Sequence, residues 1–352
     1  MSKIRIIYNG MTKEDKIKIG ISIGDINGVG IEIILKTFSD KRMYDFCTPV
    51  IFGSNNSISF YKKILNSNIQ THNITDLNNI SDDKLNVMSC WKDNVDITPG
   101  KANKTGGKYA LISLKSAVKA LKFGKIDALL TAPINKENIQ SDDFKFAGHT
   151  EFLDSELNGE SLMILMTDEL RVGLITGHIP VADISKTITS KLIKDRVNTL
   201  YQTLKQDFEI SKPKIAILGL NPHCGDNGVI GKEDDEIIRP TIKEIQEEGK
   251  LVYGPYAADG FFGSKTYKQY DGVLAMYHDQ GLAPFKSLSF GKGVNFTAGL
   301  DKIRTSPDHG TAYEIAGQGK ADESSFKEAL FKAIEIYKKR INYLKLNKNS
   351  LK

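Results

Sequence analysis

The stretch KIAILGLNPH at residues 214–223 joins a continuous apolar run to a polar end. The run Lys214–Leu220 lacks the polar–apolar alternation of a half-exposed strand, so we expect a strand that is covered on both faces. It stops at Asn-Pro, and His223 follows directly. The same pattern recurs twice, in Arg171–Thr176 before His178 and in Gly272–Tyr277 before His278.

Working outward, apolar runs alternate with helical patterns along most of the chain. Further strands are expected at Ile17–Ile23, Pro49–Phe52 and Asp127–Thr131. Helices are expected at Ile31–Phe38, Lys108–Phe123, Thr189–Gln206 and Asp234–Glu248, and from Ser325 onward. This alternation predicts the α/β class with a largely parallel sheet, and 352 residues favour two domains. The polar segment Asn66–Asp96 is expected to form loops and short strands.

Composition excludes several kinds of partner. The net charge of +5 comes from lysines spread along the chain, which is typical of a solvated surface and does not favour nucleic-acid binding. No apolar run approaches the roughly 20 residues that span a bilayer, and the N-terminal MSKIRIIYNGMTKEDK lacks a signal-peptide core and is interpreted as a short extension. Three scattered cysteines without a CxxC pair indicate a reducing, cytoplasmic setting.

The three histidines predict a metal site. Each follows the carboxyl end of an expected strand, where open α/β sheets bind ligands. His178, His223 and His278 could hold a divalent cation such as zinc and leave one position open for a substrate oxygen. Asp259 and Asp279 are candidates for carboxylates that fix the imidazole tautomers. The alternative is that each histidine only caps a helix or bonds a carbonyl.

Two other segments indicate anion binding. His149 and Thr150 stand at the expected start of a helix, although Thr150 could simply be its cap. Lys286, Asn295 and Arg304 lie in a glycine-punctuated stretch and could bind a phosphate or carboxylate, or could be surface groups. The loop Gly24–Gly30 does not match the dinucleotide-binding pattern G-x-G-x-x-G.

Six motifs, in this order, resemble the 4-hydroxythreonine-4-phosphate dehydrogenase family over about residues 17–335. They are GDxxGxGxE at 24–32, TAPINK at 131–136, GHTE at 148–151, NPH at 221–223, MYHDQGL at 276–282 and RTSPDHGTA at 304–312. The resemblance implies an isocitrate/isopropylmalate dehydrogenase-like fold, with two α/β domains around a central cleft, and a homodimer. We expect one domain from residues 1–140 plus 290–352 on the nucleotide side. Residues 141–289 would form the other, with the metal ligands and the dimer interface.

The resemblance also implies roles for single residues. His178, His223 and His278 would bind zinc, magnesium or cobalt, with one ligand supplied across the dimer interface. His149, Thr150, Lys286, Asn295 and Arg304 would contact the phosphorylated substrate. The stretch from His309 resembles the adenosine loop of isopropylmalate dehydrogenases, so Gly310 and Glu314 would contact NAD or NADP. A carboxylate at Glu314 would bond the ribose hydroxyls and repel a 2′-phosphate, which favours NAD.

The implied reaction is NAD-dependent oxidation of 4-phosphooxy-L-threonine. Decarboxylation to 3-amino-2-oxopropyl phosphate would follow, as a step of pyridoxal 5′-phosphate biosynthesis. Asp259 is a candidate to accept the hydroxyl proton. Ile26 and Asn27 depart from the family's usual proline-containing loop, which leaves open a D-threonate or D-erythronate 4-phosphate dehydrogenase of the same fold. From another class, a three-histidine site could serve a metal-dependent hydrolase.

Overall fold

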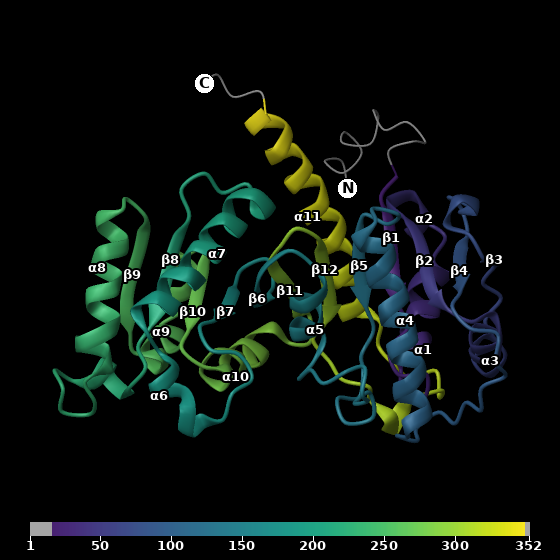
Figure 1. The fold of residues 1–352 in the computed structure, drawn as a ribbon, viewed down its shortest axis with the longest axis horizontal. Helices are drawn as coiled ribbons and strands as arrows, with labels where there is room; N and C mark the ends of the chain where they lie inside the picture. Colours follow the sequence, from purple (N-terminus) through teal and green to yellow (C-terminus); the bar gives the residue numbers. More distant parts are fainter. Residues whose placement is uncertain (1–15, 349–352) are drawn as a thin grey trace. The chain divides into compact units, whose positions relative to one another are not determined.

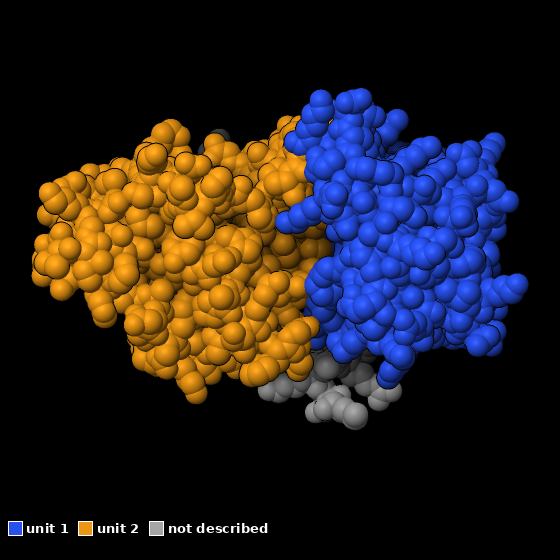
Figure 2. All heavy atoms as spheres, turned by 90° about the horizontal axis from the view of Figure 1, so that it is seen from below, with its two compact units in different colours: residues 1–145, 309–334 blue, residues 146–308, 335–352 orange. Residues whose placement is uncertain are grey.

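The computed structural model describes residues 16–348, which divide into two compact units. Unit 1 comprises residues 1–145 and 309–334, and unit 2 comprises residues 146–308 and 335–352 (Figure 2). Of the expected N-terminal extension, only Lys16 lies within the described residues.

Unit 1 is built on a parallel five-stranded sheet (Figure 1). Its strands lie in the order β3-β4-β2-β1-β5. They are β1 (Lys18–Ser22), β2 (Thr48–Gly53), β3 (Thr71–Ile74), β4 (Leu85–Ser89) and β5 (Ala128–Thr131), and the helices are α1 (Gly30–Ser39), α2 (Met43–Phe46), α3 (Asn55–Ile64) and α4 (Lys104–Lys122). Helix α4 begins where the Asn103 side chain accepts from the Gly106 amide at 2.8 Å, and it packs on β1, β2 and β5. The three strands and two helices expected in this part of the chain are confirmed.

Unit 2 holds a mixed sheet in the order β12-β11-β6-β7-β10-β8-β9. The strands are β6 (Gly159–Met166), β7 (Arg171–Leu174), β8 (Lys214–Leu218), β9 (Leu251–Tyr256), β10 (Gly272–Ala275), β11 (Val294–Leu300) and β12 (Ile303–Pro307). β7, β10, β8 and β9 pair in parallel, as expected for continuous apolar runs. β6, β11 and β12 pair antiparallel, which the sequence analysis did not predict.

Helices cover both faces of this sheet. They are α5 (His149–Glu156), α6 (Ile184–Thr187), α7 (Ser190–Phe208), α8 (Arg239–Glu247), α9 (Ala258–Gly263) and α10 (His278–Ser289). Gly272 of β10 lies against Leu200 and Leu204 of α7, whereas its neighbour Val273 packs in a core cluster with Phe285 of α10. Burial on both faces is the physical reason that these strands carry no polar alternation.

The unit boundaries differ from those expected at residues 140 and 290. The chain passes between units at residues 145 and 308, because β11 and β12 complete the sheet of unit 2 through the pairing of β11 with β6. Helix α11 (Ser324–Lys348) begins in unit 1 and ends in unit 2. Between residues 16 and 348, no helix is both long enough and apolar enough to span a membrane.

A buried ion pair ties the end of α11 to α7. Arg340 donates from Nε and Nη2 to the Asp207 carboxylate at 2.7 and 2.8 Å, and from Nη1 to the Leu300 carbonyl at 3.1 Å. The Asp207 side chain is fully buried and that of Arg340 is 8% exposed. Replacing both partners of such a pair with apolar residues changes the free energy of unfolding little. Removing only one partner is costly, because it leaves a buried charge without its counter-ion.

We therefore expect Arg340→Met to lower the free energy of unfolding by about 3–5 kcal/mol, measured by urea denaturation. The matched control is Lys339→Met, which breaks the surface pair with Glu335 and should cost less than about 1 kcal/mol. The double variant Arg340→Met with Asp207→Leu should recover most of the loss. Equal effects of Arg340→Met and Lys339→Met would contradict the anchoring role.

Candidate functional site

Two of the three predicted metal ligands lie side by side in unit 2. His178 follows β7 and His278 begins α10 directly after β10, and these two strands are parallel neighbours. The centroids of the two imidazole rings are 5.4 Å apart. Both residues line a pocket of about 480 Å³ together with Thr176, Gly177 and Tyr277. The strand ends therefore bring these side chains together as expected.

Each of these imidazoles is backed by a carboxylate. His178 Nδ1 lies 2.9 Å from Glu151 Oε1, and His278 Nδ1 lies 2.6 Å from Asp279 Oδ1. An ionised carboxylate only accepts hydrogen bonds, so the proton sits on Nδ1 and the lone pair of Nε2 is left for another partner. This is the usual arrangement of metal-binding histidines, and the two residues fit a divalent cation.

His223 is not part of this pair. It follows β8 in the short helical turn η4 (Pro222–Gly225), where it is exposed and does not line the same pocket. Across residues 16–348, no group of three or more histidine, cysteine or acidic residues is close enough to hold a metal ion. The three-histidine site therefore stays a prediction, and so does the expectation that one ligand comes from a partner subunit.

The turn that carries His223 is strained and is held by a buried acid. His223 (53°) and Cys224 (55°) in this turn have positive φ without being glycine, and so do Asp226 (45°) and Asn227 (53°) directly after it. The fully buried Asp234 carboxylate accepts from the backbone amides of Leu220 and Asn221 at 2.9 and 3.0 Å, and from the Asn221 side chain at 3.1 Å. Left-handed backbone of this kind persists only where its surroundings enforce it, and it clusters at functional sites.

His149 and Thr150 open α5, but neither caps it. The N-cap is Gly148, which has no side chain to bond the amides of the first turn. The alternative interpretation of Thr150 as a simple cap is therefore wrong. The start of α5 therefore carries an imidazole and a hydroxyl at a helix N-terminus, which is a position that suits an anion.

A polar stripe crosses β11 and β12. Asn295 pairs with Ser306, and Thr297 pairs with Arg304. Opposite residues of an antiparallel ladder, and residues two apart along a strand, share one face, so these four side chains lie together. The opposite face is apolar, with Phe296 packed edge-on against Phe208 of α7.

Arg304 is the most unusual member of this stripe, because it is a buried arginine. From the sequence alone it could equally have been a surface charge. Its side chain is only 2% exposed, and Nη1 donates to Thr297 Oγ1 at 3.2 Å. Burial lowers the pKa of the guanidinium to about 9, while attraction to Glu151 opposes that shift. The group is still a cation at neutral pH, so this face of the sheet holds a buried positive charge.

Lys286 and Asn295 are also placed for a polar ligand. Lys286 Nζ lies 3.4 Å from Asp308 Oδ1, and its side chain is 55% exposed. The side-chain oxygen of Asn295 is buried, and no hydrogen-bond partner for it occurs in the described part of the chain. Buried polar atoms are normally paired, so this oxygen points to a group that the chain itself does not supply.

Asp259, the candidate base, is exposed in the first turn of α9.

The predicted cofactor residues lie in unit 1. Gly310 and Glu314 are exposed, and a Cβ on Gly310 would meet no atom within 4 Å. Their loop is tied to the first glycine loop, because the Tyr313 hydroxyl donates to Asp25 at 2.8 Å. Glu32, fully buried, accepts from the amides of Gly317 and Ala321 at 3.0 and 2.9 Å. These contacts give the GDxxGxGxE motif a structural role that the sequence analysis did not identify.

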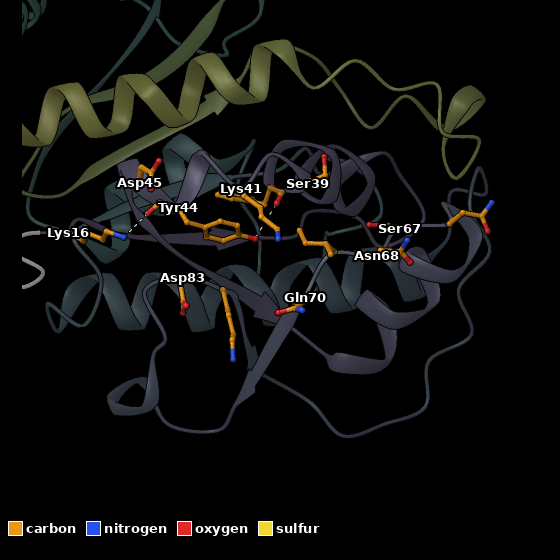
Figure 3. A pocket seen from close by; sticks show the side chains of 13 residues that line it. Lys16, Ser39, Lys41, Tyr44, Asp45, Ser67, Asn68, Gln70 and Asp83 are labelled. Carbon is orange, nitrogen blue, oxygen red and sulfur yellow. Dashed lines mark hydrogen bonds between the residues drawn. The ribbon is translucent and has the colours of Figure 1, made fainter. Parts of the chain in front are cut away.

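A second hollow, of about 830 Å³, lies elsewhere on unit 1 and contains none of the predicted site residues (Figure 3). Its wall includes Lys16, whose ammonium group donates to the Tyr44 carbonyl at 2.8 Å. The Tyr44 hydroxyl in turn donates to the Phe38 carbonyl at 3.2 Å. The ammonium group of Lys16 and the hydroxyl of Tyr44 are thus both bonded to backbone carbonyls of residues that line the hollow.

Glu32 offers a direct test of the tie between the two loops. Replacing it with alanine removes a charged acceptor from two amides, at about 1.5–3 kcal/mol for each bond. Glu32→Ala should therefore speed hydrogen exchange at the Gly317 and Ala321 amides by at least tenfold. Glu314→Gln, which neutralises an exposed carboxylate of the same loop, should leave these rates unchanged. Unaltered exchange in Glu32→Ala would show that the loop is held by other contacts.

Comparison with known proteins agrees with the fold and the motifs. The chain is 50% identical over 330 residues to a Bacteroides thetaiotaomicron protein named 4-hydroxythreonine-4-phosphate dehydrogenase, covering 93% of this chain and 91% of that protein. It is 37% identical to an Oceanobacillus iheyensis protein with the provisional name D-threonate 4-phosphate dehydrogenase, covering 90% and 97%. A crystal structure of 4-hydroxythreonine-4-phosphate dehydrogenase from Klebsiella pneumoniae matches with a TM-score of 0.78 and 31% identity, over 94% of this chain and 99% of that one.

A family model described as pyridoxal phosphate biosynthetic protein PdxA matches residues 45–333. This match covers most of the chain, and the α/β fold is that of solved PdxA structures, so the expected fold class and family resemblance are confirmed. The chain belongs to the PdxA family.

Proposed function

We propose that this protein is a 4-hydroxythreonine-4-phosphate dehydrogenase of pyridoxal 5′-phosphate biosynthesis. The observation that carries the proposal is a pair of carboxylate-backed histidines in the same unit as a buried arginine. The histidine pair suits a divalent cation, and the buried arginine suits the phosphate or carboxylate of the substrate. Relatives that cover most of the chain carry the name of this activity.

His178, His278 and His223 would hold the cation. When bound, zinc, magnesium or cobalt supplies a Lewis acid that makes a substrate hydroxyl more acidic. The exposed position of His223, away from the other two, supports a homodimer in which one subunit completes the site of the other. Such a site would form only after two chains associate.

The remaining residues would bind and orient the substrate. Arg304, Lys286 and Asn295 would take up phosphate and carboxylate oxygens, with His149 and Thr150 at the start of α5. Fixing both ends of a four-carbon substrate aligns its hydroxyl-bearing carbon, which is where specificity for this substrate would arise. The Asp259 carboxylate, exposed at the start of α9, is a candidate to take the hydroxyl proton.

The reaction balances as an oxidation followed by a decarboxylation. When bound, NAD or NADP would supply the oxidant, which accepts a hydride from the carbon of the secondary alcohol. A base would take the hydroxyl proton. The resulting β-keto acid loses carbon dioxide and gains a proton to give 3-amino-2-oxopropyl phosphate. Gly310 and Glu314 would contact the cofactor, and the acidic Glu314 favours NAD over NADP.

The same fold could serve a related substrate. The Oceanobacillus iheyensis relative, at 37% identity, is named for D-threonate 4-phosphate. D-threonate and D-erythronate 4-phosphates also have four carbons, a phosphate and a carboxylate, so the anion-binding residues alone do not separate them. Membership of the PdxA family favours all of these dehydrogenase activities over a three-histidine hydrolase. We place the protein in the cytoplasm, because its three cysteines are all free thiols.

A substrate panel tests the proposed reaction. NADH formation should be fastest with 4-phosphooxy-L-threonine, and slower by at least tenfold with D-threonate or D-erythronate 4-phosphate. A chelator should abolish turnover, and added zinc, magnesium or cobalt should restore it. Faster turnover of a sugar-acid phosphate would transfer the assignment to the second activity. Turnover that is indifferent to chelation would overturn the metal role.

His223→Ala tests the third ligand. Loss of one of three imidazoles should lower the metal content of the purified protein from stoichiometric to a small fraction, measured by elemental analysis. The control is His72→Ala, since His72 is a histidine of the edge strand β3 that bonds the Asn79 carbonyl. Full metal retention in His223→Ala would contradict the predicted ligand set.

A further inference from the structure

We infer that Glu151 is a positioning residue that fixes His178 for the metal. The inference rests on the proposed function, because it concerns how the proposed site is built. Glu151 closes the GHTE motif, and neither the sequence analysis nor the family resemblance gave it a role.

The contact with His178 sets the orientation of that imidazole. Glu151 lies in the first turn of α5, and Oε1 is 2.9 Å from His178 Nδ1, although 27 residues separate the two along the chain. Both side chains are about one-third exposed, at 34% and 28%. The carboxylate requires a proton on Nδ1, so Nε2 keeps the lone pair that a cation needs. The negative charge also makes the imidazole a stronger ligand.

Glu151 also acts on Arg304. Attraction between the two charges opposes the lowering of the Arg304 pKa by burial. The negative charge of Glu151 strengthens cation binding at His178, and it opposes any anion that approaches Arg304.

His278 provides a comparison within the same site. Its Nδ1 bonds Asp279 at 2.6 Å, but the Asp279 side chain is 86% exposed. Water screens an exposed charge, so Asp279 should influence its imidazole less than the more enclosed Glu151 does. Glu151 is therefore expected to be the more important of the two carboxylates.

The test is metal binding by the full-length protein, measured by calorimetric titration with Co²⁺ and with Zn²⁺. Glu151→Ala should weaken binding by about 10- to 100-fold, as is usual when a carboxylate behind a metal-binding histidine is lost. Glu151→Gln should weaken it less, because the amide oxygen can still accept from Nδ1–H. Asp279→Asn should have a smaller effect than Glu151→Ala. The visible spectrum of bound Co²⁺ should change in Glu151→Ala, because the geometry of the His178 ligand is no longer fixed.

Two controls separate positioning from folding. Glu169→Gln breaks a surface ion pair of unit 2 with Lys268 and should not change metal affinity. Inorganic phosphate serves as the probe of the anion site, and its affinity should be unchanged or higher in Glu151→Gln, because a competing charge is removed. A general disturbance of α5 would instead weaken phosphate and metal together and lower the melting temperature.

The outcomes are distinct. Undiminished Co²⁺ and Zn²⁺ affinity in Glu151→Ala overturns the inference, and so does a parallel loss of metal affinity, phosphate affinity and thermal stability. If the unsubstituted protein binds neither metal, both the proposed metal site and the inference fail. If it binds metal but does not oxidise 4-phosphooxy-L-threonine, the substrate assignment fails, while the titrations still decide the role of Glu151.

Discussion

The parallel pairing of β7 with β10 determines where the candidate site can form. Their hydrogen bonds continue beyond the strand ends, from the Ile175 amide to Ala275 at 2.8 Å and from the Thr176 amide to Met276 at 3.2 Å. The Thr176 hydroxyl adds a bond to the same Met276 carbonyl at 2.7 Å. Two backbones held in register this far can carry His178 and His278 only as neighbours. The apolar residues that bury both strands thus also determine the spacing of the two imidazoles.

The sequence was most informative where one local pattern was sufficient. Continuous apolar runs predicted β7, β8 and β10, and the polar residue after each run predicted the histidines at one edge of the sheet. The antiparallel strands were missed, because the pairing of β11 with β6 joins residues about 130 positions apart and leaves no local signal. Because these strands belong to the sheet of unit 2, the compact units change only at residue 308. The burial of Arg304 had no local signal either, since an arginine in a strand is ordinarily a surface group.

Carboxylates were the main omission in the site. Glu151, Asp234 and Glu32 all act on segments distant in sequence, and an acidic residue at the start of a helix looks the same whether it faces solvent or a histidine. Glu32 was quoted in a motif, yet the amides that it accepts from lie 285 and 289 residues further along the chain. Glu32 and Glu151 stand in two of the motifs, but only the tertiary structure shows which groups they bond.

The histidines are oriented by two different constraints. His178 and His278 are oriented by carboxylates on Nδ1, so their direction depends on side-chain hydrogen bonds. At His223 the constraint is on the backbone, in a left-handed turn that follows Leu220 and Asn221, which donate three hydrogen bonds to Asp234. Such a turn costs free energy, of order 1–3 kcal/mol for each strained residue, which the buried segments around it must offset. The His223 imidazole is exposed beside this constrained backbone, which suits the proposal that it completes a site on another copy of the chain.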